Sequence, residues 1–185
     1  FLFWDVAPEN KGNWQTYRFS ENFRKGEVHN ERANLDGLDV TLVLDGQQRL
    51  TSLLIGLRGS YIEKERGRRY ANADAWKTKR LYIDLLVEPD NIFDEDDDEH
   101  DEQLYGFSFE EDLPASLPGQ LWLRVGDVLN HSSPEKFEAF KTQQLSRLRQ
   151  DSTQAEREIA DRNLDRLYRM IWVDQSISYY TEQKQ

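Results

Sequence analysis

Cysteine is absent from this chain of 185 residues. That absence excludes disulfide bonds, cysteine-ligated zinc and a thiol nucleophile, and nothing in the composition argues for an oxidising compartment. The sequence also lacks an apolar run of the roughly 18 residues that a membrane-spanning helix needs, and the first residues do not show the charged-then-apolar pattern of a signal peptide. We therefore expect a cytoplasmic protein with no membrane partner.

Basic residues are scarce, because 24 lysines and arginines stand against 35 acids and give a formal net charge of −11. Eight of the acids lie within residues 94–102, and removing their charge from −11 leaves −3. This run lacks the fixed glycine and alternating ligands of a calcium loop, so a solvated loop is the simpler interpretation. The basic residues are densest at Lys64–Arg69, with Lys77, Lys79 and Arg80 following.

The length favours one domain over residues 1–185, because a domain has roughly 100–200 residues. The chain has 5 Trp, 8 Tyr and 9 Phe to bury, which argues against disorder. Phe1–Trp4 looks like the middle of a buried strand, and the last apolar stretch, at 177–180, breaks off without a cap. We therefore expect the sequence to be an excerpt from a longer protein.

Apolar periodicity predicts a mixed α/β fold. A nearly continuous apolar stretch at 39–44 is typical of a strand that is buried on both faces. Leucines at helical spacing follow from Leu50 to Leu57, and Gly59 stands where a glycine would end that helix. Further strands are predicted at 81–87, 105–109 and 121–125, and amphipathic helices at Ser133-Pro134 and at Thr153, where Glu156 completes a capping box.

The turn between the first of these strands and its helix, Asp45-Gly46-Gln47-Gln48-Arg49, has the features of an anion site. Gly46 permits a backbone path that is closed to other residues and leaves no Cβ in the way of a ligand. The amides of Gln47, Gln48 and Arg49 would be unpaired donors at the positive end of the helix dipole. The Arg49 guanidinium adds a planar fork that suits phosphate oxygens.

The other side chains of this turn allow two interpretations. In the first, Asp45 holds Mg²⁺ through water or orients the attacking water, while Gln47 or Gln48 positions that water. In the second, Asp45 and Gln48 form an Asp-x-x-Gln capping box, and the motif is only a well-capped helix with a surface arginine. The turn is not a Walker A loop, because the G-x-x-x-x-G-K-[ST] pattern is missing. Spacing alone leaves both interpretations open.

The eleven residues Val43–Leu53 (Val-Leu-Asp-Gly-Gln-Gln-Arg-Leu-Thr-Ser-Leu) resemble the signature of the GmrSD restriction-endonuclease N-terminal domain family. Phe1–Trp4, Arg80–Asp84 and Trp122–Leu129 are also similar to segments that family members carry in that order. The resemblance covers most of the chain, although only the Asp-Gly-Gln-Gln-Arg stretch is diagnostic. It implies a ParB/sulfiredoxin-like fold, an α/β arrangement with a small mixed sheet in which a strand-to-helix turn binds nucleotide phosphates.

The resemblance also implies a function. Family members act in phage defence and modification-dependent restriction, where this motif supports hydrolysis of a nucleoside triphosphate, often GTP, with Mg²⁺. Carried over by position, Asp45, Gln47 and Gln48 are the expected catalytic residues, with Asp45 as the metal ligand, and Gly46 to Arg49 are the expected nucleotide-binding residues. The expected partners are the nucleotide, DNA through the full-length protein, and a C-terminal nuclease module or partner subunit.

The sequence departs from the family in two places. An earlier segment with Pro, Tyr, Gln and Arg and a later Arg-x-Asn-x-x-Gly stretch, which family members carry, are not visible here. The His-Asn-His nuclease module is also missing, and the isolated His29, His100 and His131 show no catalytic spacing. We expect no nuclease activity from these residues.

Two other groups of side chains allow a functional interpretation beside a simpler one. Trp4, Trp14, Tyr17 and Phe23 could stack on a splayed base, although core and edge packing is the simpler account. Asp84 and Glu88 could be acid and base partners, but Asp84 alternates outward between Ile83 and Leu85, so surface solvation is simpler.

Two classes of function therefore stay open. A nucleotide-hydrolysing domain predicts a concave pocket at the start of the helix near Gly46. A non-enzymatic module that recognises DNA or a partner predicts that this helix start is covered and that a basic patch at Arg66, Arg68 and Arg69 is exposed.

Overall fold

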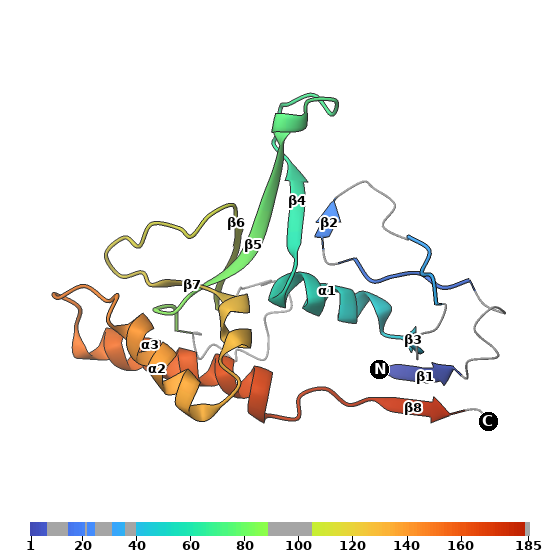
Figure 1. Ribbon diagram of the computed structural model, residues 1–185. Coiled ribbons are helices and arrows are strands. Elements are labelled where there is room, and N and C mark those ends of the chain that lie inside the picture. Colours follow the sequence, from blue (N-terminus) through green and yellow to red (C-terminus); the bar gives the residue numbers. More distant parts are fainter. Residues whose placement is uncertain (7–14, 21, 25–30, 36–39, 89–104, 184–185) are drawn as a thin grey trace, which may run out of the picture. The chain divides into compact units, whose positions relative to one another are not determined.

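The computed structural model describes residues 1–6, 15–20, 22–24, 31–35, 40–88 and 105–183 (Figure 1). The acid run at 94–102 lies outside the described residues, as do Trp14, His29 and His100. The chain divides into two compact units, Phe1–Thr78 with Gln175–Gln185, and Lys79–Asp174. The expectation of a single domain stays a prediction. None of the helices in the described ranges has the length and apolarity that a bilayer crossing requires.

The first unit holds a three-stranded mixed sheet in the order β3-β1-β8. The central strand β1 is antiparallel to β3 and parallel to β8. Helix α1 follows β3 after a single residue, so the predicted order of strand, turn and helix is confirmed. The prediction that this strand is buried on both faces is wrong, because none of its residues is buried and Leu44 is 45% exposed. The bounds are Leu2–Val6 for β1, Val40–Asp45 for β3, Gln47–Leu57 for α1 and Tyr180–Gln183 for β8.

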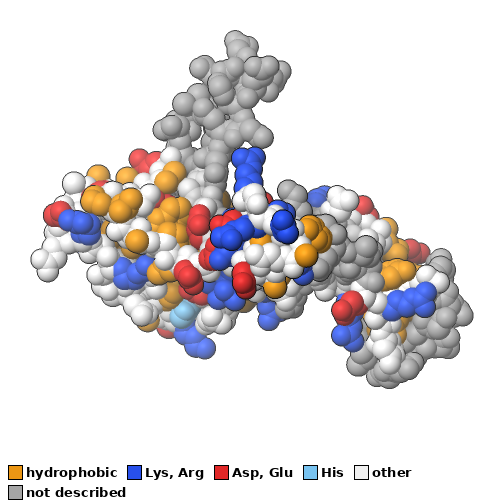
Figure 2. All heavy atoms as spheres, turned by 90° about the horizontal axis from the view of Figure 1, so that it is seen from above, with side chains coloured by type: hydrophobic (Ala, Val, Ile, Leu, Met, Phe, Trp, Pro, Cys, Tyr) orange, Lys and Arg blue, Asp and Glu red, His pale blue; other side chains and the backbone are white. Residues whose placement is uncertain are grey.

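A second pair of strands in this unit leads to an exposed turn. The short strand β2 (Asn22–Arg24) pairs in parallel with β4 (Ser60–Lys64), and the Phe23 and Tyr61 rings stack with their centroids 5.7 Å apart. After β4 the chain turns through a loop and the 3₁₀ helix η2 (Ala73–Ala75) into β5. Figure 2 looks down on this turn, and lysine and arginine side chains gather near the middle of that view.

The second unit combines antiparallel strands with two α-helices. Strand β5 enters it from the first unit and pairs with both β6 and β7, antiparallel in each case. The bounds are Trp76–Asp84 for β5, Gly106–Glu110 for β6, Trp122–Arg124 for β7, Val125–Asn130 for the 3₁₀ helix η3, Pro134–Leu145 for α2, Gln154–Tyr168 for α3 and Arg169–Val173 for the π-helix η4. The mixed α/β class predicted from the sequence is therefore confirmed.

Both predicted helix starts in the second unit are confirmed, and each carries a side-chain cap. The Ser133 hydroxyl accepts from the Lys136 amide at the start of α2. At the start of α3, Thr153 and Glu156 make the reciprocal bonds of a capping box. Such caps satisfy backbone groups that a helix end leaves unpaired, which is why a local sequence signal predicts these two helix starts correctly.

The core of the second unit lies where α2 and α3 meet. The Phe137 and Tyr168 rings stack with their centroids 4.0 Å apart, and Leu164 is completely buried. At the edge of this contact Lys141 Nζ lies 3.0 Å from Asp165 Oδ1 and 3.3 Å from Asp161 Oδ1. Apolar packing between α2 and α3, with the ion pairs of Lys141 at its edge, therefore holds the two helices together.

The interpretation of Asp84 as a solvated surface residue is wrong, because only 4% of it is exposed. Its Oδ1 accepts from the amide of Leu121 at 2.9 Å and from the amide of Leu86 at 3.1 Å. Strand β5 ends at Asp84, and the carboxylate satisfies backbone donors where the chain leaves the strand. Glu88 forms an ion pair with Arg162 instead of a partnership with Asp84. These contacts are structural.

Candidate functional site at the β3 to α1 turn

The backbone path of the turn depends on Gly46. This residue has φ 83° and ψ 17°, which is the left-handed region that L side chains rarely adopt. A Cβ at this position would also lie 2.5 Å from Cδ1 and 3.0 Å from Cε1 of the Phe1 ring. Glycine is therefore required for two independent reasons, the conformation of the chain and the space that Phe1 occupies.

Among the residues that the structure describes, none gives the start of α1 a side-chain cap. Gly46 is its N-cap residue, and the first backbone bond of the helix runs from the Leu50 amide to the Gly46 carbonyl. The capping-box interpretation of Asp45 with Gln48 is therefore wrong, because β3 continues through Asp45 and the helix starts one residue later than the box requires. In the described part of the chain, the amides of Gln47, Gln48 and Arg49 have no acceptor.

Arg49 is held loosely at the surface. Its Nη2 lies 3.4 Å from Asp45 Oδ2, and the two side chains are 66% and 71% exposed. An exposed pair of this kind contributes at most about 1 kcal/mol to stability. The guanidinium carbon also lies 5.2 Å from the centre of the Phe1 ring. The guanidinium is not locked into an internal ion pair, so an incoming anion can compete for it at small cost.

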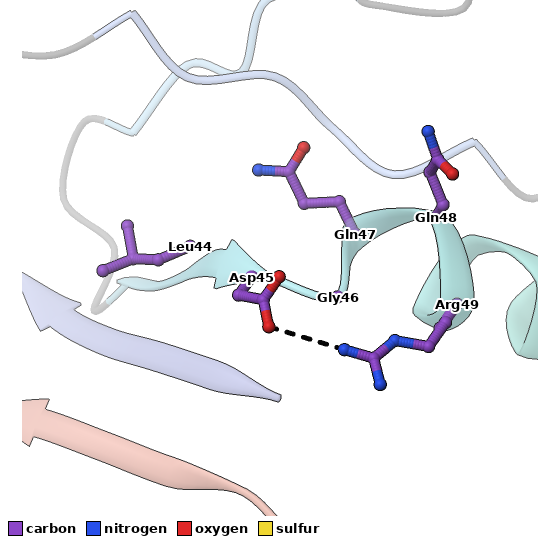
Figure 3. A pocket seen from close by; sticks show the side chains of 6 residues that line it. All are labelled: Leu44, Asp45, Gly46, Gln47, Gln48 and Arg49. Carbon is purple, nitrogen blue, oxygen red and sulfur yellow. Dashed lines mark hydrogen bonds and ion pairs between the residues drawn. The ribbon is translucent and has the colours of Figure 1, made fainter.

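The two glutamines differ in their surroundings. The Gln47 side chain donates from Nε2 to the Val43 carbonyl at 2.9 Å, which ties the first residue of the helix back to β3. The Gln48 side chain is exposed and has no hydrogen-bond partner within the described residues. In Figure 3 the Gln47 and Gln48 side chains leave the helix on one side and the Asp45–Arg49 pair lies on the other. Gln48 is therefore the freer of the two to meet a ligand.

These residues together line an open pocket of about 390 Å³. Its wall combines one carboxylate, two amides, one guanidinium and the unpaired amides of the helix start, with the Leu44 side chain at its edge (Figure 3). The volume is in the range of small-molecule sites. A wide-open depression therefore lies at the helix start, where a nucleotide-binding domain predicts a concave pocket, and the Phe1 ring packs beside Gly46 at this place.

The site can be tested for its fit to Mg²⁺. The described residues contain no group of three or more His, Cys, Asp or Glu side chains that could hold a metal ion. Asp45 is the single carboxylate in the pocket and is well exposed. Mg²⁺ in nucleotide sites is held by one or two carboxylates, with substrate phosphates and water as the other ligands. The donor set therefore fits a metal that arrives with a nucleotide and does not fit a resident metal centre.

The structure also places His131 and the three arginines of the predicted basic patch. His131 stacks on the Phe140 ring with centroids 4.2 Å apart, which is a packing role. Arg66, Arg68 and Arg69 are all exposed, as the DNA-recognition class predicts, although that class also predicts a covered helix start. Sequence reasoning did not identify Phe1 as a neighbour of the site, because the contact arises only when β1 pairs with β3.

No protein-family model matches the chain, and no curated protein matches it significantly.

Proposed function

We propose that this chain is a nucleoside-triphosphate binding and hydrolysing domain, with GTP as the expected nucleotide, that regulates a modification-dependent DNA restriction or phage-defence protein. The observation that carries the proposal is the uncapped start of α1 behind Gly46, beside an exposed Arg49. Three unpaired amides and a guanidinium in one small volume suit a phosphate group better than a carboxylate. The choice of GTP and of a restriction system rests on the resemblance of the motif to the GmrSD N-terminal family.

The Asp45–Arg49 pair fits a simple exchange on nucleotide binding. Without a ligand, the carboxylate and the guanidinium neutralise each other at the surface. A triphosphate tail offers Arg49 a bidentate acceptor of higher charge, so the guanidinium moves from the carboxylate to the phosphate oxygens. Asp45 would then be available to hold a Mg²⁺ ion that accompanies the nucleotide, and such an ion would neutralise charge on the phosphates.

Gln48 is the residue that we assign to the attacking water. Its side-chain carbonyl can accept a hydrogen bond from water without titrating, which is the role of glutamine in other nucleotide hydrolases. The water oxygen forms a bond to the γ-phosphorus, the bond from that phosphorus to the β–γ bridging oxygen breaks, and the proton of the water passes to the released phosphate. Gln47 holds the helix start against β3 through the Val43 carbonyl, so it supports the geometry of the amides.

Isothermal titration with Mg²⁺ and the non-hydrolysable β,γ-imido analogue of GTP tests the proposal. We expect the wild type to bind and Arg49→Ala to bind about ten to a hundred times more weakly, because a hydrogen bond to a charged group contributes roughly 1.5–3 kcal/mol. Arg58→Ala is the matched control, since Arg58 is an exposed arginine just after the end of the same helix. Equal binding to wild type and Arg49→Ala, or binding to neither, would remove the proposal.

A further inference from the structure

The loop after β4 concentrates positive charge on an acidic chain. The segment Lys64–Tyr70, which we call the basic turn, has the sequence Lys-Glu-Arg-Gly-Arg-Arg-Tyr and therefore four cations and one acid. Its net charge of +3 over seven residues contrasts with the net charge of −11 for the whole chain. Such a local excess of one sign creates a field that attracts a partner of the opposite sign.

Internal hydrogen bonds give the basic turn a defined shape. Lys64 Nζ donates to the Arg68 carbonyl at 2.6 Å, and the Glu65 amide donates to the Ala75 carbonyl at 2.7 Å across the turn. Gly67 has φ 82°, and a Cβ there would meet no atom of the described residues within 4 Å. The cationic groups thus lie on a turn that its own hydrogen bonds hold together.

The arginines of the basic turn differ in whether they have an ion-pair partner. Arg68 pairs with Glu65 at 3.2 Å, which accounts for the one acid. Arg66 and Arg69 are exposed and have no ion-pair partner in the part of the chain that the structure describes. In Figure 2, lysine and arginine side chains lie near the middle of the view, with acidic side chains among them. Two guanidinium groups are therefore free to bind oxyanions of a partner.

The basic turn ends in an aromatic residue, Tyr70, which follows Arg69 directly in the sequence. Tyr70 is 60% exposed, and its ring packs edge-on against Trp76 with centroids 5.0 Å apart. Trp76 is fixed in turn, because its Nε1 donates to the Tyr70 carbonyl at 3.2 Å and the Arg24 guanidinium lies 3.9 Å from its ring centre. Tyr70 is thus held in place with most of its surface in solvent, where it can pack on a sugar or base.

We propose that the basic turn is a docking surface for double-stranded DNA, in which Arg66 and Arg69 bind backbone phosphates and Tyr70 packs against the sugar or base edge. Guanidinium forks match phosphate geometry, and the evenly spaced phosphates of a duplex offer acceptors to both arginines at once. Strands β4 and β5, which precede and follow the basic turn, are hydrogen-bonded neighbours in one sheet. A two-stranded β-ribbon fits the major groove of B-form DNA, which is about 12 Å wide. This inference goes beyond the nucleotide site and does not depend on it.

Fluorescence anisotropy with a labelled 20-base-pair duplex, without nucleotide or Mg²⁺, tests the inference over a range of salt concentrations. We expect log affinity to fall linearly with log salt, and the Arg66→Ala/Arg69→Ala variant to lose about 1.8 from the magnitude of that slope, because each phosphate contact contributes roughly 0.9. Arg66→Lys/Arg69→Lys should keep the slope, since it keeps the charge. Tyr70→Ala should weaken binding several-fold with the slope unchanged, because an uncharged ring releases no counterions.

The matched control is Arg58→Ala/Arg166→Ala, which removes the same two charges from exposed positions outside the turn. If this control lowers the slope as much as the Arg66/Arg69 variant does, the binding is diffuse and the inference is overturned. Stronger binding to a 20-nucleotide single strand than to the duplex, or binding only to anionic phosphatidylserine vesicles, also overturns it. Circular dichroism of each variant establishes that the fold is intact, and loss of nucleotide binding in Arg49→Ala leaves this test unaffected.

Discussion

Replacing Gly46 with alanine should destabilise the protein in two separable ways. An alanine with φ near 83° costs about 1–2 kcal/mol, because the left-handed region brings Cβ too close to the following carbonyl oxygen. The new Cβ would also lie 2.5 Å from Phe1 Cδ1, so the ring must move. Phe1 is half-buried, and full burial of such a side chain is worth roughly 1.5–3 kcal/mol, so its displacement costs about 1 kcal/mol more. We expect a total of about 2–3 kcal/mol.

Gly67 provides the matched control for this substitution. It has φ 82°, nearly the same as Gly46, but a Cβ there meets nothing within 4 Å. Gly67→Ala should therefore cost only the conformational part, about 1–2 kcal/mol. The assay is urea unfolding followed by circular dichroism, with the free energy of unfolding extrapolated to water.

A double-mutant cycle with Phe1→Ala separates the two costs. In a Phe1→Ala background the steric part should vanish, and Gly46→Ala should then cost the same as Gly67→Ala. If Gly46→Ala costs no more than Gly67→Ala in the wild type, the Phe1 ring does not fill the space beside Gly46 and the reasoning is refuted. Gly46→Ala should also abolish binding of the GTP analogue, because the amides at the start of α1 move when the backbone of the turn changes.

Two further predictions concern catalysis and pH. Gln48→Ala should lower the rate of phosphate release about a hundredfold with little change in affinity for the nucleotide. Gln47→Ala should also lower the stability of the protein, because it removes the hydrogen bond to the Val43 carbonyl. Equal effects of the two substitutions on rate and on stability would contradict the division of roles. Burial lowers the pKa of Lys141, but hydrogen bonds and charge from Asp165 and Asp161 outweigh it and hold the pKa above its ordinary value. The ion pairs of Lys141 therefore contribute fully to folding stability below about pH 10.4, and this contribution is lost as the pH rises through the higher pKa of the folded protein. Urea titrations should show that wild type is about 1 kcal/mol more stable than Lys141→Met at neutral pH, and that this difference shrinks above about pH 10.4.

The sequence by itself determined the local elements of this protein. The capping signals at Ser133 and Thr153 fixed the starts of α2 and α3, because a cap is made by residues a few positions apart. The apolar run before Asp45 and the leucine spacing after it fixed β3 and α1, and with them the contiguous residues of the candidate site. These features need no knowledge of distant contacts.

Only the tertiary structure decided which groups are free and which are used. The interpretation of Asp45 and Gln48 as a capping box failed because sheet pairing with β1 extends β3 to Asp45 and moves the N-cap to Gly46. Asp84 is buried at a position where its carboxylate accepts a hydrogen bond from the amide of Leu121, 37 positions away. Phe1 reaches the site by strand pairing. Within the described residues Arg66 and Arg69 have no ion-pair partner, since the one acid of the turn pairs with Arg68. Contacts between positions far apart in the chain depend on pairing and packing that the spacing of residue types does not specify.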